Sequence, residues 1–199
     1  MWESSHYEVL KAQTLCSQKN RLKLSKTFLQ SFSLSESILS GFNMKTAILL
    51  LTVVLMAVLP ECEMAKFGQL CSGNSSNRRR TGDNWGQGQY GASRTDHVHK
   101  GIDIVCNDGA TVYAPFDVKL NGKVTVYTNP KKAAINDGIN LSGEGLCFKL
   151  FYVKPDSYSG VVKKGQRIGT LLPMQSVYPG ITSHVHVQMC DKSDPTKYF

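Results

Sequence analysis

The apolar residues beyond position 100 fall in short runs, and this pattern limits the fold more than any other feature of the sequence. The runs are rich in Val, Ile, Tyr and Phe and are separated by Gly, Asn, Asp and Pro, which is typical of strands joined by turns. No stretch of ten or more of these residues shows clear helical spacing of its apolar positions. We therefore predict an all-β domain with an antiparallel β-sheet core and long loops. The expected strands lie in the segments GIDIVC, TVYAPF, VKLNGKVTVY, GINLSG, LCFKLFYVK, RIGTLL and HVHVQMC.

Two local patterns refine this picture. Asn121-Gly122 lies between two alternating runs and predicts a tight hairpin. Residues 66–94 are rich in Gly, Ser, Asn and Arg, and they predict an irregular loop tied down by Cys71. Within that loop we interpret Arg78-Arg79-Arg80 as solvated, with contact to an acidic partner as the alternative. Asn74-Ser75-Ser76 is an N-glycosylation sequon in what the sequence suggests is a surface loop.

An apolar segment inside the chain predicts export from the cell. After Met44 and Lys45, residues 47–59 form an uncharged apolar stretch that ends at Pro60. The stretch is too short to span a bilayer as a helix, and it has the positive start and polar end of a secretory signal peptide. We therefore predict a secreted, extracellular protein without membrane insertion.

This interpretation divides the chain into three parts. Residues 44–65 are the expected signal peptide, with cleavage after Ala65, and residues 66–199 form a single domain. Residues 1–43 are interpreted as an upstream extension that is not part of the mature protein. The alternative is a signal-anchor protein in which residues 1–43 form a cytosolic head.

Removal of the signal peptide would also determine which cysteines remain. Cys16 and Cys62 would be lost, and four cysteines would stay in the mature domain. An even number in a small secreted domain predicts two disulfides, although four cysteines allow three pairings. Zinc binding by these cysteines is the alternative, but none of them has C-x-x-C spacing. The four are Cys71, Cys106, Cys147 and Cys190.

The charge balance favours acidic partners. The net charge is +8, and residues 67–199 hold 16 Lys and Arg against 10 Asp and Glu. A basic secreted domain suits acidic glycans or anionic cell surfaces. Nucleic acid is disfavoured, because the sequence has no basic helix, no aromatic ladder and no Cys/His finger spacing. A glycan site could use Lys131-Lys132, Lys163-Lys164 and the arginine run, and scattered solvated charge is the alternative explanation for them.

Four of the five histidines lie in two HVH tripeptides. In an extended strand residues i and i+2 face the same side, so His184 and His186 project together. His99 and Asp103 share a face by the same logic, whereas His97 is the weakest member and is expected to be exposed. Two such strands brought together would present His, Asp and His to one point, which suits zinc with one position left open. The alternative is that each histidine makes only local structural contacts.

These motifs resemble the lysostaphin-type (LytM-like) zinc endopeptidases, which cut bacterial wall peptides. The resemblance lies in H-x-x-x-D at His99 and Asp103, in H-x-H at His184 and His186, and in two glycine-containing turns, Gly109–Pro115 and Gly165–Gly169. Longer segments across residues 66–199 are similar to a secreted vertebrate signalling branch of that superfamily. The resemblance implies a lysostaphin/LytM-like antiparallel β fold and a zinc ion, Zn2+, held by His99, Asp103 and His186.

The same resemblance carries further implications for the cysteines. It implies the disulfides Cys71–Cys106 and Cys147–Cys190. Mammalian members of the signalling branch have one more cysteine pair in the N-terminal loop, and Gly82 and Gln87 stand at those places here. Because both partners are missing together, no odd thiol is left.

The catalytic set of the peptidases is incomplete in this chain. The active enzymes use two histidines that do not bind the metal, and His184 matches one of them. Tyr152, within Leu150-Phe151-Tyr152-Val153, occupies the place of the other. Tyrosine has an unperturbed pKa of about 10, so near neutral pH it donates a hydrogen bond but accepts a proton poorly. We therefore predict a non-catalytic metallopeptidase homologue, with His184 and Tyr152 as a vestigial pair.

The resemblance then implies a chemotactic, immune-modulatory factor that acts through cell-surface receptors. In this hypothesis zinc is structural and joins strands that are far apart in the sequence. The alternative is an active zinc endopeptidase that cleaves glycine-rich or bacterial cell-wall peptides. A module that binds acidic glycans is a third hypothesis.

Overall fold

The computed structural model describes residues 65–94 and 97–199. The predicted extension and all of the predicted signal peptide except Ala65 lie outside the described residues, as do Cys16 and Cys62. No helix within the described ranges is long and apolar enough to cross a membrane.

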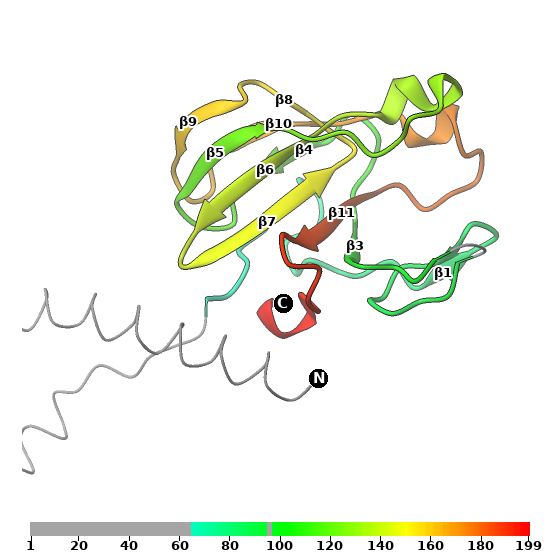
Figure 1. Cartoon of the computed structure of the whole chain (residues 1–199), viewed down its shortest axis with the longest axis horizontal. Helices are drawn as coiled ribbons and strands as arrows, with labels where there is room; N and C mark the ends of the chain where they lie inside the picture. The colour runs from blue at the N-terminus through cyan, green and yellow to red at the C-terminus, as the bar shows by residue number, and fades with distance from the viewer. Residues whose placement is uncertain (1–64, 95–96) are drawn as a thin grey trace, which may run out of the picture. The chain divides into compact units, whose positions relative to one another are not determined.

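The domain is all-β and antiparallel, as the sequence predicts (Figure 1). Three sheets have six, three and two strands. The six-stranded sheet runs in the order β3 (Ile102–Val105), β11 (His184–Met189), β7 (Leu146–Phe151), β6 (Gly138–Gly143), β5 (Val118–Lys123), β9 (Ser159–Val162). The three-stranded sheet contains β4 (Thr111–Tyr113), β10 (Arg167–Leu171) and β8 (Val153–Pro155), and the hairpin contains β1 (Gly82–Asp83) and β2 (Gly86–Gln87). Short 3-10 helices, which the sequence patterns did not predict, are η3 (Pro130–Ile135), η4 (Met174–Ser176) and η5 (Thr196–Tyr198).

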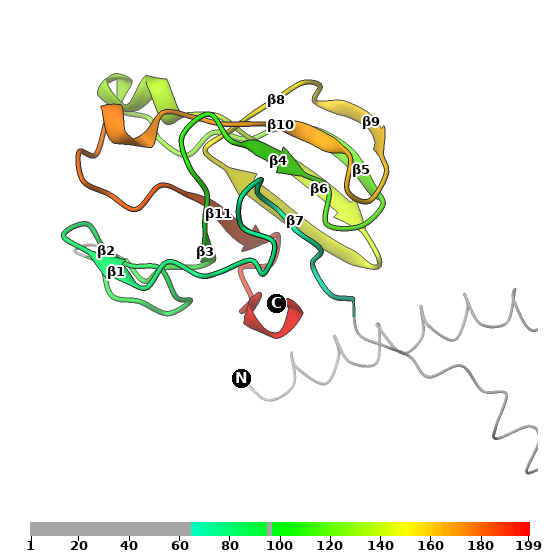
Figure 2. The same ribbon diagram turned by 180° about the vertical axis from the view of Figure 1, so that it is seen from behind.

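Strands β3 and β11 lie side by side and bury both of their faces. Ile102 and Ile104 of β3 and Val185 and Val187 of β11 belong to the hydrophobic core, and all four are fully buried. Because side chains alternate along a strand, the residues between them point to the opposite side. This alternation gives the two strands a core face and a second face that carries Asp103 and both histidines of β11. Figure 2 shows the pair from behind.

Aromatic packing joins the two ends of the described domain. Phe67 packs edge-on against Phe116 and Phe148, with ring centroids 5.2 and 4.9 Å apart, an arrangement that aromatic pairs favour. Its backbone N–H donates to the carbonyl of Tyr198 at 2.8 Å, and its ring lies 4.7 Å from that of Phe199. Residues 67 and 198 therefore close the same part of the core.

The chain passes from the large sheet to the three-stranded sheet at Tyr152, which separates β7 from β8. Tyr152 has a φ of 66°, in the left-handed region that costs a residue with a side chain about 1–2 kcal/mol. Its backbone is held on both sides: its N–H donates to Asp137 and its carbonyl accepts from Leu172. The corner therefore fixes where the Tyr152 ring lies.

The predicted hairpin at Asn121-Gly122 is wrong. Both residues lie inside β5. Leu120 pairs with Leu141 of β6 and Lys123 pairs with Ile139, so β5 has one residue more than β6 between these two pairs. This is a β-bulge, and Gly122 occupies it with a φ of 111°. A glycine with positive φ serves a bulge as well as a turn, so the dipeptide alone does not distinguish them. A two-residue hairpin instead joins β6 and β7 through Glu144-Gly145, both with positive φ, as type I′ turns require.

The sequon asparagine is not on the surface. Asn74 is 8% exposed, and its amide donates to the carbonyls of Arg78 and Val105 at 3.0 and 2.9 Å. Its side-chain oxygen accepts from the Arg78 N–H at 2.7 Å. The amide therefore organises the N-terminal loop from within, and the folded domain leaves no room for a glycan on it.

The structure contains the two disulfides that the resemblance implied. Cys71–Cys106 ties the N-terminal segment to the residue after β3, and both of its cysteines are buried. Cys147–Cys190 links the neighbouring strands β7 and β11 near the ends of their pairing. Together they tie the residues that follow β3 and β11 to other parts of the domain.

The two positions of the missing cysteine pair face each other. Gly82 of β1 is the register partner of Gln87 of β2. They lie one pair beyond the Asn84-Trp85 turn, the position that in a two-residue antiparallel hairpin is the more closely spaced pair without hydrogen bonds. Such a pair has the Cα separation that a disulfide needs.

The double variant Gly82→Cys with Gln87→Cys should therefore form a third disulfide. Closing so short a loop should stabilise the domain by about 2 kcal/mol in the chain-entropy estimate. Intact mass with and without reductant counts the bonds, and thermal unfolding measures the gain. The variant Gly82→Ser with Gln87→Ser is the control for side-chain size. Free thiols at both positions in air-oxidised protein would contradict the register.

Candidate metal centre

Strand pairing brings the sequence-predicted metal ligands together. Asp103 of β3 and His186 of β11 are direct register partners, so their side chains project from the same face at the same height. His99 precedes β3 and reaches the site from a loop whose backbone is held twice by the 91–92 segment, through Gly91 N–H to His99 O and His99 N–H to Ala92 O, both at 2.9 Å. All three side chains are buried or nearly so.

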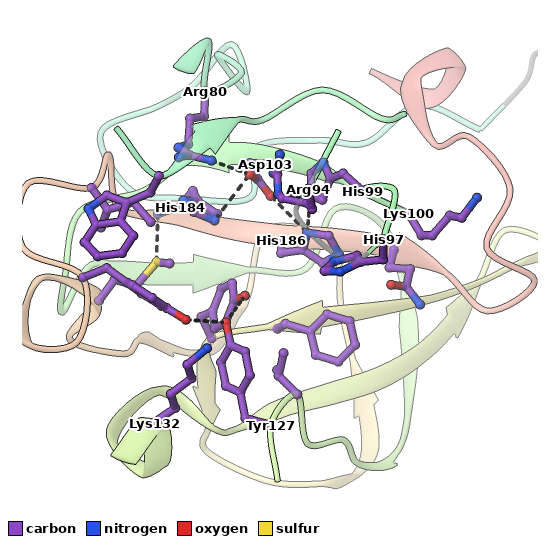
Figure 3. Close-up of a pocket in the computed structure, with 18 of the residues that line it drawn as sticks. Arg80, Arg94, His97, His99, Lys100, Asp103, Tyr127, Lys132, His184 and His186 are labelled. Carbon is purple, nitrogen blue, oxygen red and sulfur yellow. Dashed lines mark hydrogen bonds and ion pairs between the residues drawn. The ribbon is translucent and has the colours of Figure 1, made fainter. Parts of the chain in front are cut away.

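The three potential ligand atoms form a nearly regular triangle (Figure 3). His99 Nε2 lies 2.9 Å from His186 Nδ1 and 3.2 Å from Asp103 Oδ1, and His186 Nδ1 lies 3.0 Å from that oxygen. A tetrahedral zinc ion with bonds of about 2.0–2.1 Å separates such ligands by about 3.3 Å. The atoms need to move apart by only a few tenths of an ångström, so the donor set fits zinc.

Neighbouring groups hold the two imidazoles in the orientation that a metal needs. His99 Nδ1 donates to the carbonyl of Gln89 at 2.7 Å, which leaves Nε2 as the atom with a lone pair toward the site. His186 packs against Gly101, where an added Cβ would lie 2.5 Å from ring atom Cε1 and 2.6 Å from Nε2. Only glycine at position 101 leaves space for this ring, so the residue between His99 and Asp103 is also part of the site.

The second oxygen of Asp103 is held by other side chains. Arg80 Nη1 donates to Oδ2 at 3.0 Å, and His184 Nε2 lies 3.5 Å from it. Burial opposes ionisation of this carboxyl, yet its contacts with His184, His186 and His99 hold its pKa well below the usual value. Asp103, which is 1% exposed, is therefore ionised near neutral pH and available to a cation.

Arg80 is the residue of this site that the sequence analysis missed. The arginine run was interpreted as solvated, and Arg78 and Arg79 are exposed, but Arg80 is only 3% exposed. Its guanidinium also binds both oxygens of Asp83, at 3.0 and 2.6 Å. The i, i+3 spacing of Arg80 and Asp83 was a weak signal of that pair, and no sequence pattern connects Arg80 with Asp103.

Asp83 extends this network to the segment that leads into β11. Its carboxylate accepts a hydrogen bond from the backbone N–H of Thr182 at 2.8 Å. The backbone carbonyl of Thr182 in turn accepts a hydrogen bond from His184 Nδ1 at 2.7 Å. Arginine and N–H contacts lower the pKa of Asp83 despite partial burial. The β1–β2 hairpin is thus linked to the position of His184.

His184 and Tyr152 lie beside the triangle but outside it. Burial lowers the pKa of His184, and its contact with Asp103 opposes that shift. The Tyr152 ring meets it edge to face, with centroids 5.7 Å apart. Burial raises the pKa of Tyr152 to about 12, and its hydroxyl is hydrogen-bonded to that of Tyr127 at 2.9 Å. At position 152 the site therefore offers a hydrogen-bond donor rather than a base.

The site opens into a groove of about 810 Å³. His97 is exposed on its lining and does not belong to the triangle. The other lining residues include basic and aromatic side chains, several of which are labelled in Figure 3.

The chain is similar to two named proteins along nearly their whole length and to part of a third. It is 52% identical over 148 residues to leukocyte cell-derived chemotaxin-2 of Mus musculus, covering 74% of this chain and 97% of that protein. For the protein of the same name from Bos taurus the identity is 50% over 147 residues, with 74% and 96% covered. Myeloid protein 1 of Gallus gallus is 48% identical over 135 residues, which are 66% of this chain and 41% of that longer protein.

Solved structures give more distant likenesses. Helicobacter pylori Csd3 has a TM-score of 0.45 and 15% identity, over 68% of this chain and 33% of that chain. The solution structure of lysostaphin has a TM-score of 0.39 and 21% identity, over 57% and 47% of the two chains. The comparison with protein-family models finds no match.

Arg80 should matter most when the metal is absent. Without a metal ion it is a main source of positive charge for Asp103, and breaking such a buried pair typically costs about 3–5 kcal/mol. Arg80→Met should therefore destabilise chelator-treated protein strongly, and zinc should restore more stability to this variant than to the unmodified protein. Chemical denaturation with chelator and with zinc measures both gaps. Arg78→Met, at an exposed position, is the control. Equal losses with and without metal would mean that Arg80 acts only through Asp83.

Proposed function

The chain belongs to the leukocyte cell-derived chemotaxin-2 family, and from this premise we propose that it is a secreted, zinc-binding chemotactic signalling protein on a non-catalytic metallopeptidase scaffold. The observation that carries the proposal is the combination of an intact His-Asp-His triangle with a tyrosine where a peptidase needs a second base. The first feature supports metal binding and the second argues against turnover.

The zinc assignment is supported by the chemistry of the three donors. Two imidazoles and one carboxylate, with one position left open, are typical of zinc sites in proteins. The ligands lie on β11 and on the segment from His99 to Asp103, which are more than 80 residues apart in the sequence. A metal that joins them would add its binding energy to the stability of the fold. In this proposal zinc is structural.

The side chains around the triangle support the absence of catalysis. Zinc in a peptidase site acidifies a bound water and polarises the scissile carbonyl. Proton transfer by positioned side chains contributes about 10²–10⁴-fold beyond that. Here His184 is held by Thr182 and by the Asp103 contact, and the hydroxyl of Tyr152, with a pKa of about 12, gives up its proton too reluctantly to serve as the second base.

Secretion and receptor binding complete the proposal. Two disulfides are typical of proteins that leave the cytosol. The chemotaxin name of the relatives supports a role in cell attraction, which requires a partner on the cell surface. Acidic glycans are a weaker candidate, because Lys163 is already paired with Asp117 at 2.8 Å and exposed lysines bind polyanions without a specific site.

Loss of one ligand should remove the metal. His186→Ala should lower both the zinc content and the melting temperature, because it leaves two donors and an empty space beside Gly101. Metal analysis of the purified domain and thermal unfolding measure the two effects. His97→Ala, from the exposed part of the first HVH motif, should keep its zinc. Unchanged zinc and unchanged melting in His186→Ala would overturn the ligand set.

Zinc-loaded protein should not hydrolyse peptides. Residues 66–199 with confirmed zinc, tested on a pentaglycine-type substrate beside an active lysostaphin-type enzyme, should show no turnover. Tyr152→His tests the cause, since histidine tolerates the left-handed backbone there comparatively well; any activity that it gains should disappear with His184→Ala. Clear turnover by the unmodified protein, abolished by His184→Ala, would instead favour the endopeptidase hypothesis.

A further inference from the structure

The groove beside the triangle has an unbalanced charge. Among the described lining residues the only carboxylate is Asp103, and Arg80 and the neighbouring histidines already compensate it. Lys100, Lys132 and Lys192 line the same groove, and within the described ranges none of these three is ion-paired with a carboxylate. The groove is therefore electropositive before any metal binds, and a metal would increase that charge.

One of these lysines is fixed in position rather than freely mobile. The ammonium of Lys132 lies 4.4 Å from the centre of the Tyr127 ring and 5.3 Å from that of Tyr178 (Figure 3). Such cation–π contacts hold the ammonium group in place before a ligand arrives. Binding of an anion therefore costs little further side-chain entropy. Lys131, its neighbour on η3, is exposed and does not line the groove, so the two lysines differ in position but not in chemistry.

The tyrosines next to Lys132 have one proton to spare. Tyr178 donates its hydroxyl to that of Tyr127 at 3.3 Å, and the hydroxyls of Tyr127 and Tyr152 share a hydrogen bond at 2.9 Å. Three hydroxyl groups supply three protons for these two bonds. One proton, on Tyr127 or Tyr152, is therefore available to an acceptor in the groove. Because burial raises the pKa of Tyr152 to about 12, that proton stays on the phenol near neutral pH.

Apolar surface borders this polar patch. Trp85 is 44% exposed, although its indole N–H donates to the Pro179 carbonyl at 2.9 Å and its ring packs edge-on against Tyr178. Val98, which also lines the groove, is 44% exposed as well. Exposed apolar side chains around a charged centre suit a peptide, which has both apolar and acidic groups, better than a sulfated glycan.

We propose that this groove binds an acidic peptide segment of a protein partner, with an Asp or Glu carboxylate accepting the spare tyrosine proton beside Lys132 and apolar neighbours packing on Trp85 and Val98. The proposal rests on the proposed function, because it assigns the groove of a non-catalytic scaffold to recognition. Charge complementarity and the volume of about 810 Å³, which is large enough for several side chains, both favour it.

Two blocked peptides test the proposal directly. The probe is fluorescein-labelled (Glu-Phe-Gly)3 with an amidated C-terminus, and its matched control is (Gln-Phe-Gly)3, which has the same shape without the charges. Fluorescence anisotropy on zinc-loaded protein should give at least about tenfold tighter binding for the Glu peptide, as expected for hydrogen bonds to a charged group. Zinc content is measured on the same samples, so a failure of metal binding is recognised separately.

Three variants locate the binding. Lys132→Gln, and Tyr127→Phe combined with Tyr152→Phe to remove both hydroxyls that can carry the spare proton, should each weaken the Glu peptide by about fivefold or more and leave the Gln peptide nearly unchanged. Lys131→Gln should have little effect on either peptide. Thermal unfolding of the double tyrosine variant checks that it folds, and Lys132→Gln, at a half-buried surface site, keeps the test valid if it does not.

Several outcomes would overturn the proposal. Equal affinity for the Glu and Gln peptides would mean that the carboxylate is not recognised. An equal loss of affinity for the Glu peptide in Lys131→Gln and Lys132→Gln would show diffuse attraction of polyanions. The same conclusion would follow if a heparin fragment displaced the labelled Glu peptide at concentrations too low for unlabelled Glu peptide to displace it. Zinc-loaded protein that binds neither peptide would reject the acidic segment while leaving the metal assignment intact.

Discussion

The pairing of β3 with β11 is the interaction on which the rest of the domain depends. One register places Ile102, Ile104, Val185 and Val187 in the core and, on the opposite side, sets Asp103 against His186. A shift of one residue would turn every one of these side chains to the wrong face. Folding and site assembly are therefore one event, and the hydrophobic core supplies the free energy that holds three ligand atoms about 3 Å apart.

The network around Arg80 has a second, electrostatic role. A buried carboxylate without compensation would be too costly to keep ionised. Arg80 and the surrounding histidines keep Asp103 charged before a metal arrives, and Asp83 holds Arg80 in place from the β1–β2 hairpin. The N-terminal loop, which the sequence predicts to be irregular, thus contributes the positive charge of Arg80 that stabilises the buried Asp103 carboxylate.

Features that follow a periodic residue pattern can be predicted from the sequence, whereas contacts between residues that no pattern connects cannot. Alternating β-branched residues predict the antiparallel sheets, and the spacing within the second HVH motif predicts that His184 and His186 share a face. The two disulfide pairs follow from resemblance, since four cysteines alone allow three arrangements. Arg80 could not be found in this way, because its partner Asp103 is 23 residues away and joined to it only by the fold. Asn74 and Asn121-Gly122 were misread because the same short motif can serve a surface loop, a buried bridge, a turn or a bulge.

The contact between the beginning and the end of the domain has a topological consequence. Phe67 donates to Tyr198, and Lys66 Nζ reaches the Lys197 carbonyl at 2.9 Å. The polypeptide from 66 to 199 is therefore almost a closed ring. A short linker could join its two ends, and new ends could be opened at the exposed Glu144-Gly145 turn, far along the chain from the histidines. Circular permutation would then separate the order in which β3 and β11 are synthesised from the register in which they pair.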